Sequence, residues 1–243
     1  MVRITKSCPA PESLRLEAQK KHGSYSKPDV VARLKEDFHD KCYICEMKGL
    51  QDPQIEHLLP HENGRYADRK FDWENLFWAC GHCNRVKNRG KYKEGILNCC
   101  QRDPEEAMTF YLKKEDIEVR PRKTDDREAV LTSELIEDVF NLKNTGMRVA
   151  GSAVRVRLLQ EEMNVLYTKL EAYRRNPESK LLLKMLRVLL RRDSAFAGFK
   201  RCYVREHAEQ YPALQEYFES GRTKQIYEHH NPTFKSVQPR GFL

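Results

Sequence analysis

Apolar residues recur at helical spacing along most of the chain. Residues 28–38 begin with a proline and repeat apolar side chains every three or four positions, and the same spacing returns over 126–144 and from 146 to about 175. Proline favours the first turn of a helix, and this spacing places the apolar side chains on one face. The sequence therefore predicts helices over these three ranges.

A fourth helix is predicted after Arg175, where Asn176 could cap the first turn and Pro177 could occupy the first helical position. The stretch that follows, SKLLLKMLRVLLRR, carries apolar residues around most of its circumference rather than along one stripe. We therefore expect this helix to be buried, either within its own domain or against a partner.

Alternation of apolar and polar residues marks two short stretches typical of strands. QIEHLLP, residues 54–60, has the form of a strand end that runs into a turn, and DIEVRP, residues 116–121, alternates in strand fashion. Between them, DPEEAMTFYL has the form of a short helix that begins at Pro104. Together these patterns predict an α+β protein that is predominantly helical.

Two CxxC pairs frame the first of these stretches: Cys42 with Cys45, and Cys80 with Cys83, with thirty-four residues between the pairs. Four thiolates suit a tetrahedral Zn²⁺ with closed coordination, which is a structural rather than a catalytic arrangement. Such a metal can supply on the order of 10–16 kcal/mol of folding free energy to a segment with few apolar residues of its own. The sequence predicts a structural zinc site here, against the alternative of four cysteines spaced by chance.

Polar residues capable of chemistry lie between and beside the two pairs: Glu56, His57, Asn75 and Asn84. Neighbours on a strand point to opposite faces, so Glu56 and His57 share one direction only where the strand bends or bulges. Taken alone, His57 could also be a zinc ligand or a packed strand histidine. Asn75 could simply satisfy buried backbone groups within its aromatic surroundings.

In this order the residues resemble the HNH endonucleases, whose ββα-metal motif has the form CxxC, (D/E)H, N and CxxC(H/N)xxK. The similarity covers about residues 38–98. The residues that carry it are Cys42, Cys45, Glu56, His57, Asn75, Cys80, Cys83, Asn84 and Lys87. The resemblance implies a small nuclease module, stapled by zinc, that hydrolyses phosphodiester bonds in nucleic acid.

The resemblance also implies a role for each polar residue. His57 would be the general base that activates water, Glu56 and Asn84 would hold a catalytic Mg²⁺ or Mn²⁺, and Asn75 would orient the histidine loop. Glu56 and Asn84 stand where the commonest form of the motif has aspartate and histidine, and both keep an oxygen ligand. Asn88 is an alternative to Asn84 as the asparagine beside the cation.

Charge is spread unevenly over a chain whose net formal charge is +8. Residues 99–142 carry seven basic and twelve acidic side chains, whereas residues 143–243 carry nineteen and ten. Five basic residues follow Cys83 with no acid among them: Arg85, Lys87, Arg89, Lys91 and Lys93. Such a run can follow a phosphate backbone without reading sequence, so we expect it to bind DNA or RNA, an ordinary solvated helix face being the alternative.

Breaks in pattern and charge divide the chain into four expected parts. These are an N-terminal helical entry segment, the nuclease module, an acidic connecting region and a basic C-terminal helical domain, at 1–41, 42–98, 99–142 and 143–243. Eight cysteines without a cleavable apolar leader predict a reducing compartment, the cytoplasm, and free thiols at Cys8, Cys99, Cys100 and Cys202. No run of about 18 apolar residues is present, so no membrane span is expected.

A second, broader resemblance extends beyond the motif: DPEEAMTFY, VFNLKNTGMRVA and DSAFAGFKR are similar to segments of the HNH subunit of Septu-type anti-phage systems, including retron-linked forms. It implies a prokaryotic defence nuclease that works with a separate ABC-type or AAA-family ATPase subunit, which would dock on the C-terminal helices. Two alternatives stay open. One is a stand-alone restriction or homing-type HNH enzyme, and the other is a zinc-containing nucleic-acid-binding module without catalysis.

Overall fold

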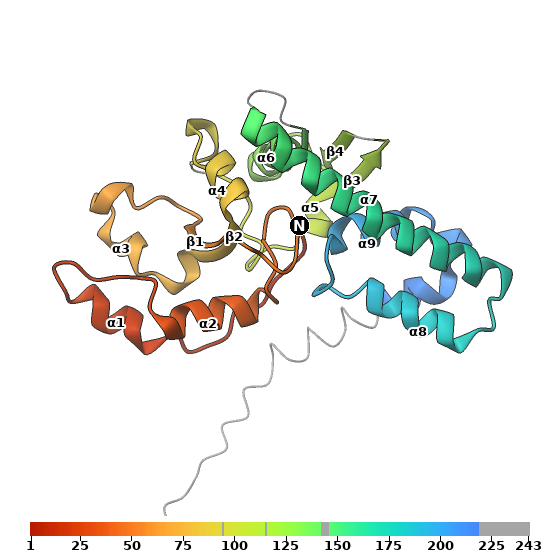
Figure 1. Ribbon diagram of the computed structural model, residues 1–243, viewed down its shortest axis with the longest axis horizontal. Helices are drawn as coiled ribbons and strands as arrows, with labels where there is room; N and C mark the ends of the chain where they lie inside the picture. The colour runs from red at the N-terminus through yellow and green to blue at the C-terminus, as the bar shows by residue number, and fades with distance from the viewer. Residues whose placement is uncertain (94, 115, 142–145, 219–243) are drawn as a thin grey trace, which may run out of the picture. The chain divides into compact units, whose positions relative to one another are not determined.

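The computed structural model describes residues 1–93, 95–114, 116–141 and 146–218 (Figure 1). The described chain divides into two units, Met1–Tyr203 and a second that begins at Val204. Over the described ranges the fold is mixed α+β, with helices and two small antiparallel sheets. The predicted class, α+β and rich in helix, is confirmed at this level.

The first sheet pairs β1 (Pro53–His57) with β2 (Leu76–Cys80), and α4 (Gly81–Lys87) follows β2 directly. Every residue of β2 is buried, because LFWAC is apolar throughout and α2 (Pro28–Asp37) packs against it. The strand at β1 and the helix α2 confirm the predictions for residues 54–60 and 28–38.

Short elements complete the part of the first unit around this sheet. They are the helices α1 (Glu12–Ala18) and α3 (Ala67–Lys70) and the 3₁₀ turns η1 (Glu62–Gly64), η2 (Trp73–Asn75) and η3 (Gly90–Tyr92). The Asp72 carboxylate accepts a hydrogen bond from the backbone N–H of Glu74 at 3.0 Å and so caps η2. The chain between the two strands is therefore held in short turns that bring β2 back beside β1.

The second sheet pairs β3 (Met108–Lys113) with β4 (Asp116–Pro121), and α6 (Arg127–Asn141) packs on β4. The predicted helix at Pro104 exists as α5 (Pro104–Ala107), but the prediction is wrong for the residues after it, which form β3. Met108 and Phe110 alternate with less buried residues along β3, and that period of two suits a strand with one buried face. The strand predicted at β4 is confirmed.

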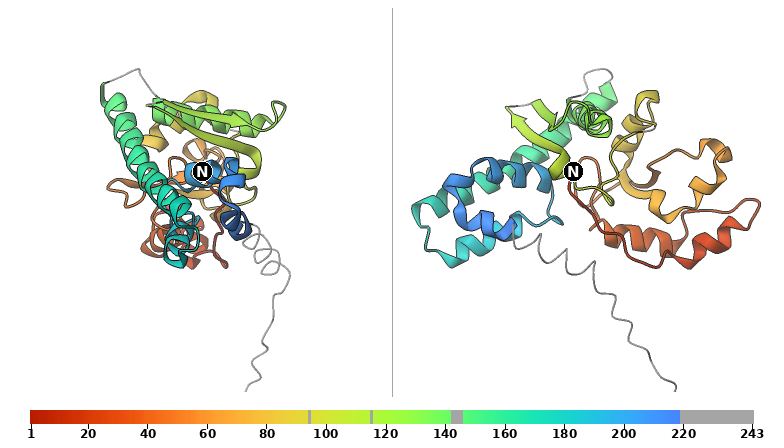
Figure 2. Two further views of the ribbon diagram at one scale, coloured as in Figure 1. Left: turned by 90° about the vertical axis from the view of Figure 1, so that its right-hand side faces the viewer. Right: turned by 180° about the vertical axis from the view of Figure 1, so that it is seen from behind.

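Three further helices follow, α7 (Gly146–Arg175), α8 (Lys180–Leu189) and α9 (Ala197–Glu206). After them come the 3₁₀ turn η4 (Ala208–Gln210) and a helical stretch over residues 212–218. The long α7 packs against α6 and then against α8 (Figure 2). The predicted start of α8 is wrong, because Asn176 and Pro177 lie in the turn before it. Ser179 is the cap instead, and its hydroxyl accepts a hydrogen bond from the backbone N–H of Leu182 at 3.3 Å.

The helix α8 is also less buried than its composition suggests. Leu186 is fully buried, whereas Leu181 and Val188 are 66% and 55% exposed. The apolar residues of α8 cover more than one face, and within the described chain α7 covers only one of them. The expectation of burial within its own domain is therefore wrong, and burial against a partner stays a prediction.

Buried polar contacts tie the first CxxC pair to the region around α9. The Lys41 ammonium, 1% exposed, lies 3.2 Å from a Glu46 carboxylate oxygen and donates to the carbonyl of Ser194 at 3.2 Å. The other oxygen of Glu46 accepts from the backbone N–H of Gly198 at 2.8 Å. The boundaries expected after residues 41, 98 and 142 accordingly lie inside the first compact unit.

The second unit is described from Val204 to Phe218. There the amide of Gln215 donates to the carbonyl of Val204 at 3.1 Å, and the Arg205 guanidinium lies 4.6 Å from the centre of the Phe218 ring. The expected C-terminal domain also includes residues 219–243, which lie outside the described residues, as do 142–145 within VFNLKNTGMRVA. Among the helices of the described ranges, none combines the length and apolar character that a bilayer crossing needs.

Candidate functional site

The four cysteines of the two CxxC pairs meet in the interior of the first unit. Cys42 and Cys45 precede β1, Cys80 ends β2 and Cys83 lies in the first turn of α4. All four are buried, and their sulfur atoms lie within 4.8 Å of one another. Thiolates at about 2.3 Å from one tetrahedral ion stand about 3.8 Å apart, so this group could hold a metal ion such as zinc.

A guanidinium from a distant helix reaches this cluster. Arg155, in the first half of α7, is buried, and its Nη2 donates to the Sγ of Cys80 at 2.9 Å. The helices α4 and α7 meet closely there, since a Cβ on Gly151 would lie 2.5 Å from Nδ1 of His82. In the sequence, nothing distinguishes Arg155 from the other basic residues of α7.

His57 lies at the end of β1 with its ring half-buried. Its Nε2 lies 3.1 Å from the backbone carbonyl of Lys70, and a carbonyl oxygen only accepts hydrogen bonds. Nε2 therefore carries the proton and Nδ1 keeps a lone pair. Burial lowers the pKa of His57 to about 4, so the ring is neutral at pH 7. The structure thus presents an imidazole in the tautomer and charge state of a general base.

Asn75 holds the loop that follows His57. Its Oδ1 accepts from the backbone N–H of Leu59 at 2.8 Å, while its Nδ2 donates to the carbonyls of Leu59 and Arg69, each at 2.9 Å. The side chain is 5% exposed, so these bonds satisfy buried backbone groups that water does not reach. The same loop carries the Lys70 carbonyl that binds His57, so Asn75 positions the imidazole indirectly.

Glu56 points away from His57, as alternate residues of a strand do. One carboxylate oxygen lies 2.5 Å from Nζ of Lys87 and the other accepts from the Tyr43 hydroxyl at 2.7 Å. Burial raises the pKa of Glu56, and both partners oppose that shift. With both oxygens engaged and the side chain 3% exposed, Glu56 is not placed as a cation ligand in this structure, which corrects the role expected for it.

Asn84 and Asn88 lie one turn apart on α4 and its C-terminal cap, so they share a face. The Asn84 Nδ2 donates to the Gln54 side chain at 2.7 Å, and its Oδ1 accepts from Asn88 Nδ2 at 3.0 Å. The Asn88 Oδ1 has no hydrogen-bond partner among the described residues. The structure therefore brings both asparagines to the same place and leaves the choice between them open.

A cavity of about 320 Å³ joins these groups. It is lined by Tyr25, Ile55, Glu56, His57, Pro60, His61, Glu62, Asn63, Asn84 and Asn88. Both asparagines thus face the same space as the histidine, together with one further carboxylate at Glu62. His57 and Asn84 meet there as expected, whereas Glu56 reaches the wall with its carboxylate turned inward.

Tyr25 and His61 are members of this cavity to which the sequence gave no role in chemistry. The Tyr25 ring stands edge-on to the His57 ring at a centroid distance of 4.6 Å, and the His61 ring does so at 4.7 Å. Nδ1 of His61 is buried without a hydrogen-bond partner among the described residues. Tyr25 comes from the segment between α1 and α2, and no spacing rule connects that segment to the cysteine pairs.

The five basic residues after Cys83 do not form one continuous exposed surface. Lys87 is 1% exposed and donates to the carbonyls of His57 and Leu58 at 3.0 and 2.9 Å, which corrects its expected role in binding phosphates. Arg89 and Lys91 form ion pairs with Asp138 of α6 at 3.6 and 3.7 Å. Arg85 and Lys93 are exposed and stay available. The expected interface is thus reduced by the acids of the neighbouring helix.

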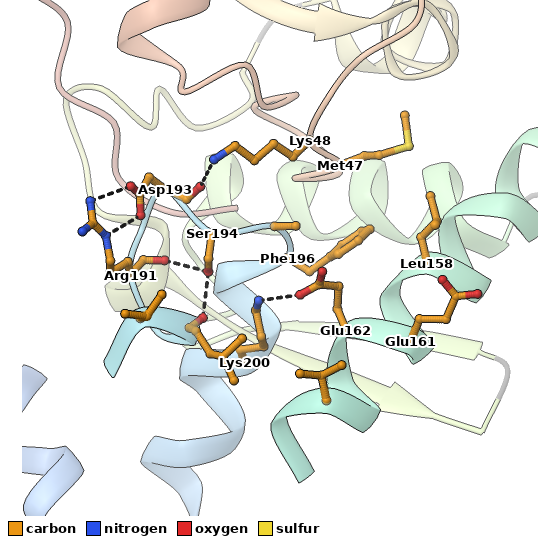
Figure 3. Close-up of a pocket in the computed structure, with 14 residues that line it drawn as sticks. Met47, Lys48, Leu158, Glu161, Glu162, Arg191, Asp193, Ser194, Phe196 and Lys200 are labelled. Atoms are coloured by element: carbon orange, nitrogen blue, oxygen red, sulfur yellow. Dashed lines mark hydrogen bonds and ion pairs between the residues drawn. The ribbon is translucent and has the colours of Figure 1, made fainter. Parts of the chain in front are cut away.

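A second cavity of about 720 Å³ lies beside α7, α8 and the segment before α9 (Figure 3). Charged side chains of its wall form ion pairs with one another: Lys200 lies 2.9 Å from Glu162, and Arg191 lies 2.7 Å from Asp193. None of the residues expected to carry chemistry lines it. We therefore assign the candidate site to the smaller cavity at His57.

No protein-family model matches the chain. No curated protein matches it at a significant level.

Proposed function

We propose that the chain is a metal-dependent endonuclease that hydrolyses phosphodiester bonds in nucleic acid with His57 as general base. The observation that carries the proposal is the bond from His57 Nε2 to the Lys70 carbonyl at 3.1 Å. It leaves a basic nitrogen on a neutral ring that lines a cavity with amide and carboxylate oxygens. A positioned base of this kind contributes typically about 10²–10⁴-fold to the rate.

The donors at the cavity suit a hard cation only in part. Asn84, Asn88 and Glu62 offer the oxygen ligands that Mg²⁺ and Mn²⁺ prefer. Glu56 does not, because Lys87 and Tyr43 hold its carboxylate. A bound divalent cation would supply the positive charge that stabilises a phosphoryl group in hydrolysis. The protein's own part is to hold the imidazole by the Lys70 carbonyl and the loop by Asn75.

The zinc assignment belongs to the same proposal. Four buried thiolates at one point favour a structural Zn²⁺ that fixes β2 and α4 relative to the loop before β1. That ion would keep the residues of β1 and α4 on opposite walls of one cavity. In this account zinc has no direct part in the chemistry.

From the second resemblance we also propose a wider setting. The chain would be the nuclease subunit of a prokaryotic, cytoplasmic anti-phage system, and a separate ATPase subunit would control it. The exposed apolar residues Leu181 and Val188 on α8 agree with a docking surface in that region. The substrate class is DNA or RNA, because a hydrolytic phosphate site and a backbone-following basic surface serve both.

Purified chain, with and without its presumed ATPase, should be incubated with plasmid and with tRNA in Mg²⁺, in Mn²⁺ and in EDTA. We expect cleavage in at least one cation and none in EDTA. Full-rate cleavage that no ATPase changes would remove the partner from the proposal. A single defined cleavage site would favour the restriction or homing type of enzyme.

One observation favours a non-catalytic alternative. The carboxylate expected beside the cation is locked in a buried ion pair, which would suit a zinc-containing module that binds nucleic acid without cutting it. Binding of nucleic acid without cleavage distinguishes this alternative from the nuclease. An intact chain that binds plasmid or tRNA, but cleaves neither in any cation or with the ATPase, would support the alternative.

A further inference from the structure

We propose that Arg155 is part of the metal centre, where its guanidinium offsets the negative charge of the four thiolates and joins α7 to the metal site. This inference does not require the nuclease proposal. It depends only on the four-cysteine group and on the contacts of α7 around it.

The charge balance of the centre calls for such a group. Four thiolates around a divalent cation leave a net negative charge inside the protein, and an isolated buried charge is costly. Groups outside the ligand shell that donate to the ligands commonly hold such a centre in place. The Nη2 of Arg155 donates to Cys80 Sγ at 2.9 Å, which is contact with a ligand atom itself.

The surroundings of Arg155 identify the sulfurs as its counter-charge. The side chain is 5% exposed, and a guanidinium stays charged in proteins. Its Nη1 donates to the carbonyl of Gly151 at 2.6 Å, and its Nε finds no partner among the described residues. No carboxylate in the described ranges pairs with it. The thiolates therefore provide the anionic partner that keeps this cation inside the protein.

The same contacts connect the metal site with helices far along the chain. Ser152 of α7 donates to the carbonyl of Val139 in α6 at 2.9 Å, and His82 of α4 lies 3.0 Å from that same carbonyl through Nε2. His82 sits between Cys80 and Cys83. Without the metal, Arg155 loses its fixed anionic partner, and the first half of α7 loses a contact at the point where three helices meet.

The test uses the full chain loaded with zinc and three variants. Arg155→Met removes the charge at similar length, Arg155→Lys keeps it, and Arg157→Met changes an exposed arginine two residues away that pairs with Glu161 at 3.8 Å. Transfer of zinc to an excess of a chromogenic chelator should be roughly 10-fold or more faster in Arg155→Met than in the wild type. Arg155→Lys should fall between them, and Arg157→Met should match the wild type.

Two further readouts separate a charge partner from a packing residue. With Co²⁺ in place of zinc, loss of the donor to sulfur should move the thiolate-to-cobalt charge-transfer band to lower energy in Arg155→Met. Removal of zinc from the wild type should speed hydrogen exchange over residues 149–160 more than over 108–121. The proposal is overturned by wild-type release and an unshifted band in Arg155→Met, or by α7 protection that survives removal of the metal.

Discussion

At the scale of single residues, the ion pair with Lys87 holds the Glu56 carboxylate of β1 inside the protein. Removing one partner of a buried ion pair leaves the other charge inside without compensation, at a cost of about 3–5 kcal/mol. Lys87→Met should therefore lower the free energy of unfolding by roughly that amount. The exposed Lys93→Met should change it by less than about 0.5 kcal/mol. Urea unfolding of the zinc-loaded variants measures both values.

Equal stabilities for Lys87→Met and Lys93→Met would contradict the buried pair. Lys87 would then again be a candidate for phosphate binding, as the sequence suggested. Weakened binding of nucleic acid in a variant that stays as stable as the wild type would point the same way.

Residue types and spacing were enough to predict which side chains gather, but not what each one touches. The four cysteines gather at one point, and His57 and Asn84 line one cavity, as their order suggested. Glu56 failed because its direction depends on the strand face, and Lys87 became its partner only through the fold. The contact of Arg155 with Cys80 could not have been predicted from the sequence, because the two residues are seventy-five positions apart.

At the scale of elements, α8 is the case in which composition and burial disagree. Leu186 is packed inside, so Leu186→Ala should cost about 2–5 kcal/mol of unfolding free energy. Leu181 is 66% exposed, so Leu181→Ser should cost less than about 0.5 kcal/mol. Thermal or urea unfolding of the two variants of the full chain distinguishes them. A large loss in Leu181→Ser would show that something within the chain covers this face.

The elements themselves were predictable where periodicity was long and regular. The helices α2, α6 and α7 and the strands β1 and β4 all follow from spacing alone. The strand β3 was missed because it follows the short helix α5 without a break, so that DPEEAMTFYL has the form of one helix. Its pairing partner β4 lies beyond a turn. The cap of α8 was misplaced because Asn176 and Pro177 formed a plausible start three residues before the real one at Ser179.

At the scale of the whole molecule, the carboxylate of Glu46 ties the first CxxC pair to α9. Burial alone would raise its pKa, but the positive charges of the Met1 amino group and Lys41 lower it to about 2. A carboxyl whose pKa falls on folding stabilises the fold above its unfolded pKa, near 4.5. That stabilisation, roughly 3 kcal/mol, is lost as the pH falls from about 4.5 towards 2.

Glu46→Gln should therefore be less stable than the wild type at pH 7. The difference should shrink as the pH falls below about 4.5. Urea midpoints measured from pH 7 to pH 3 provide the comparison, and Glu12→Gln, at an exposed helix start, is the matched control. A constant gap across that range would mean that Glu46 is not the titrating contact.

The chain's division into parts was the feature least accessible from sequence. Composition and charge suggested four segments, yet contacts such as Lys41 with the Ser194 carbonyl and Arg155 with Cys80 cross the expected boundaries. Polar residues that pair over seventy-five positions or more leave no periodic signal. They become visible only once the backbone has placed them together.

The most direct test of the central claim is the rate of nucleic-acid cleavage by His57→Ala, with His22→Ala as an exposed histidine outside the cavity for comparison. Both variants should keep zinc and their fold, measured by metal content and thermal unfolding. We expect His57→Ala to lose at least about 10²-fold in cleavage rate while His22→Ala keeps the wild-type rate. Wild-type cleavage by a folded, zinc-loaded His57→Ala would contradict this expectation.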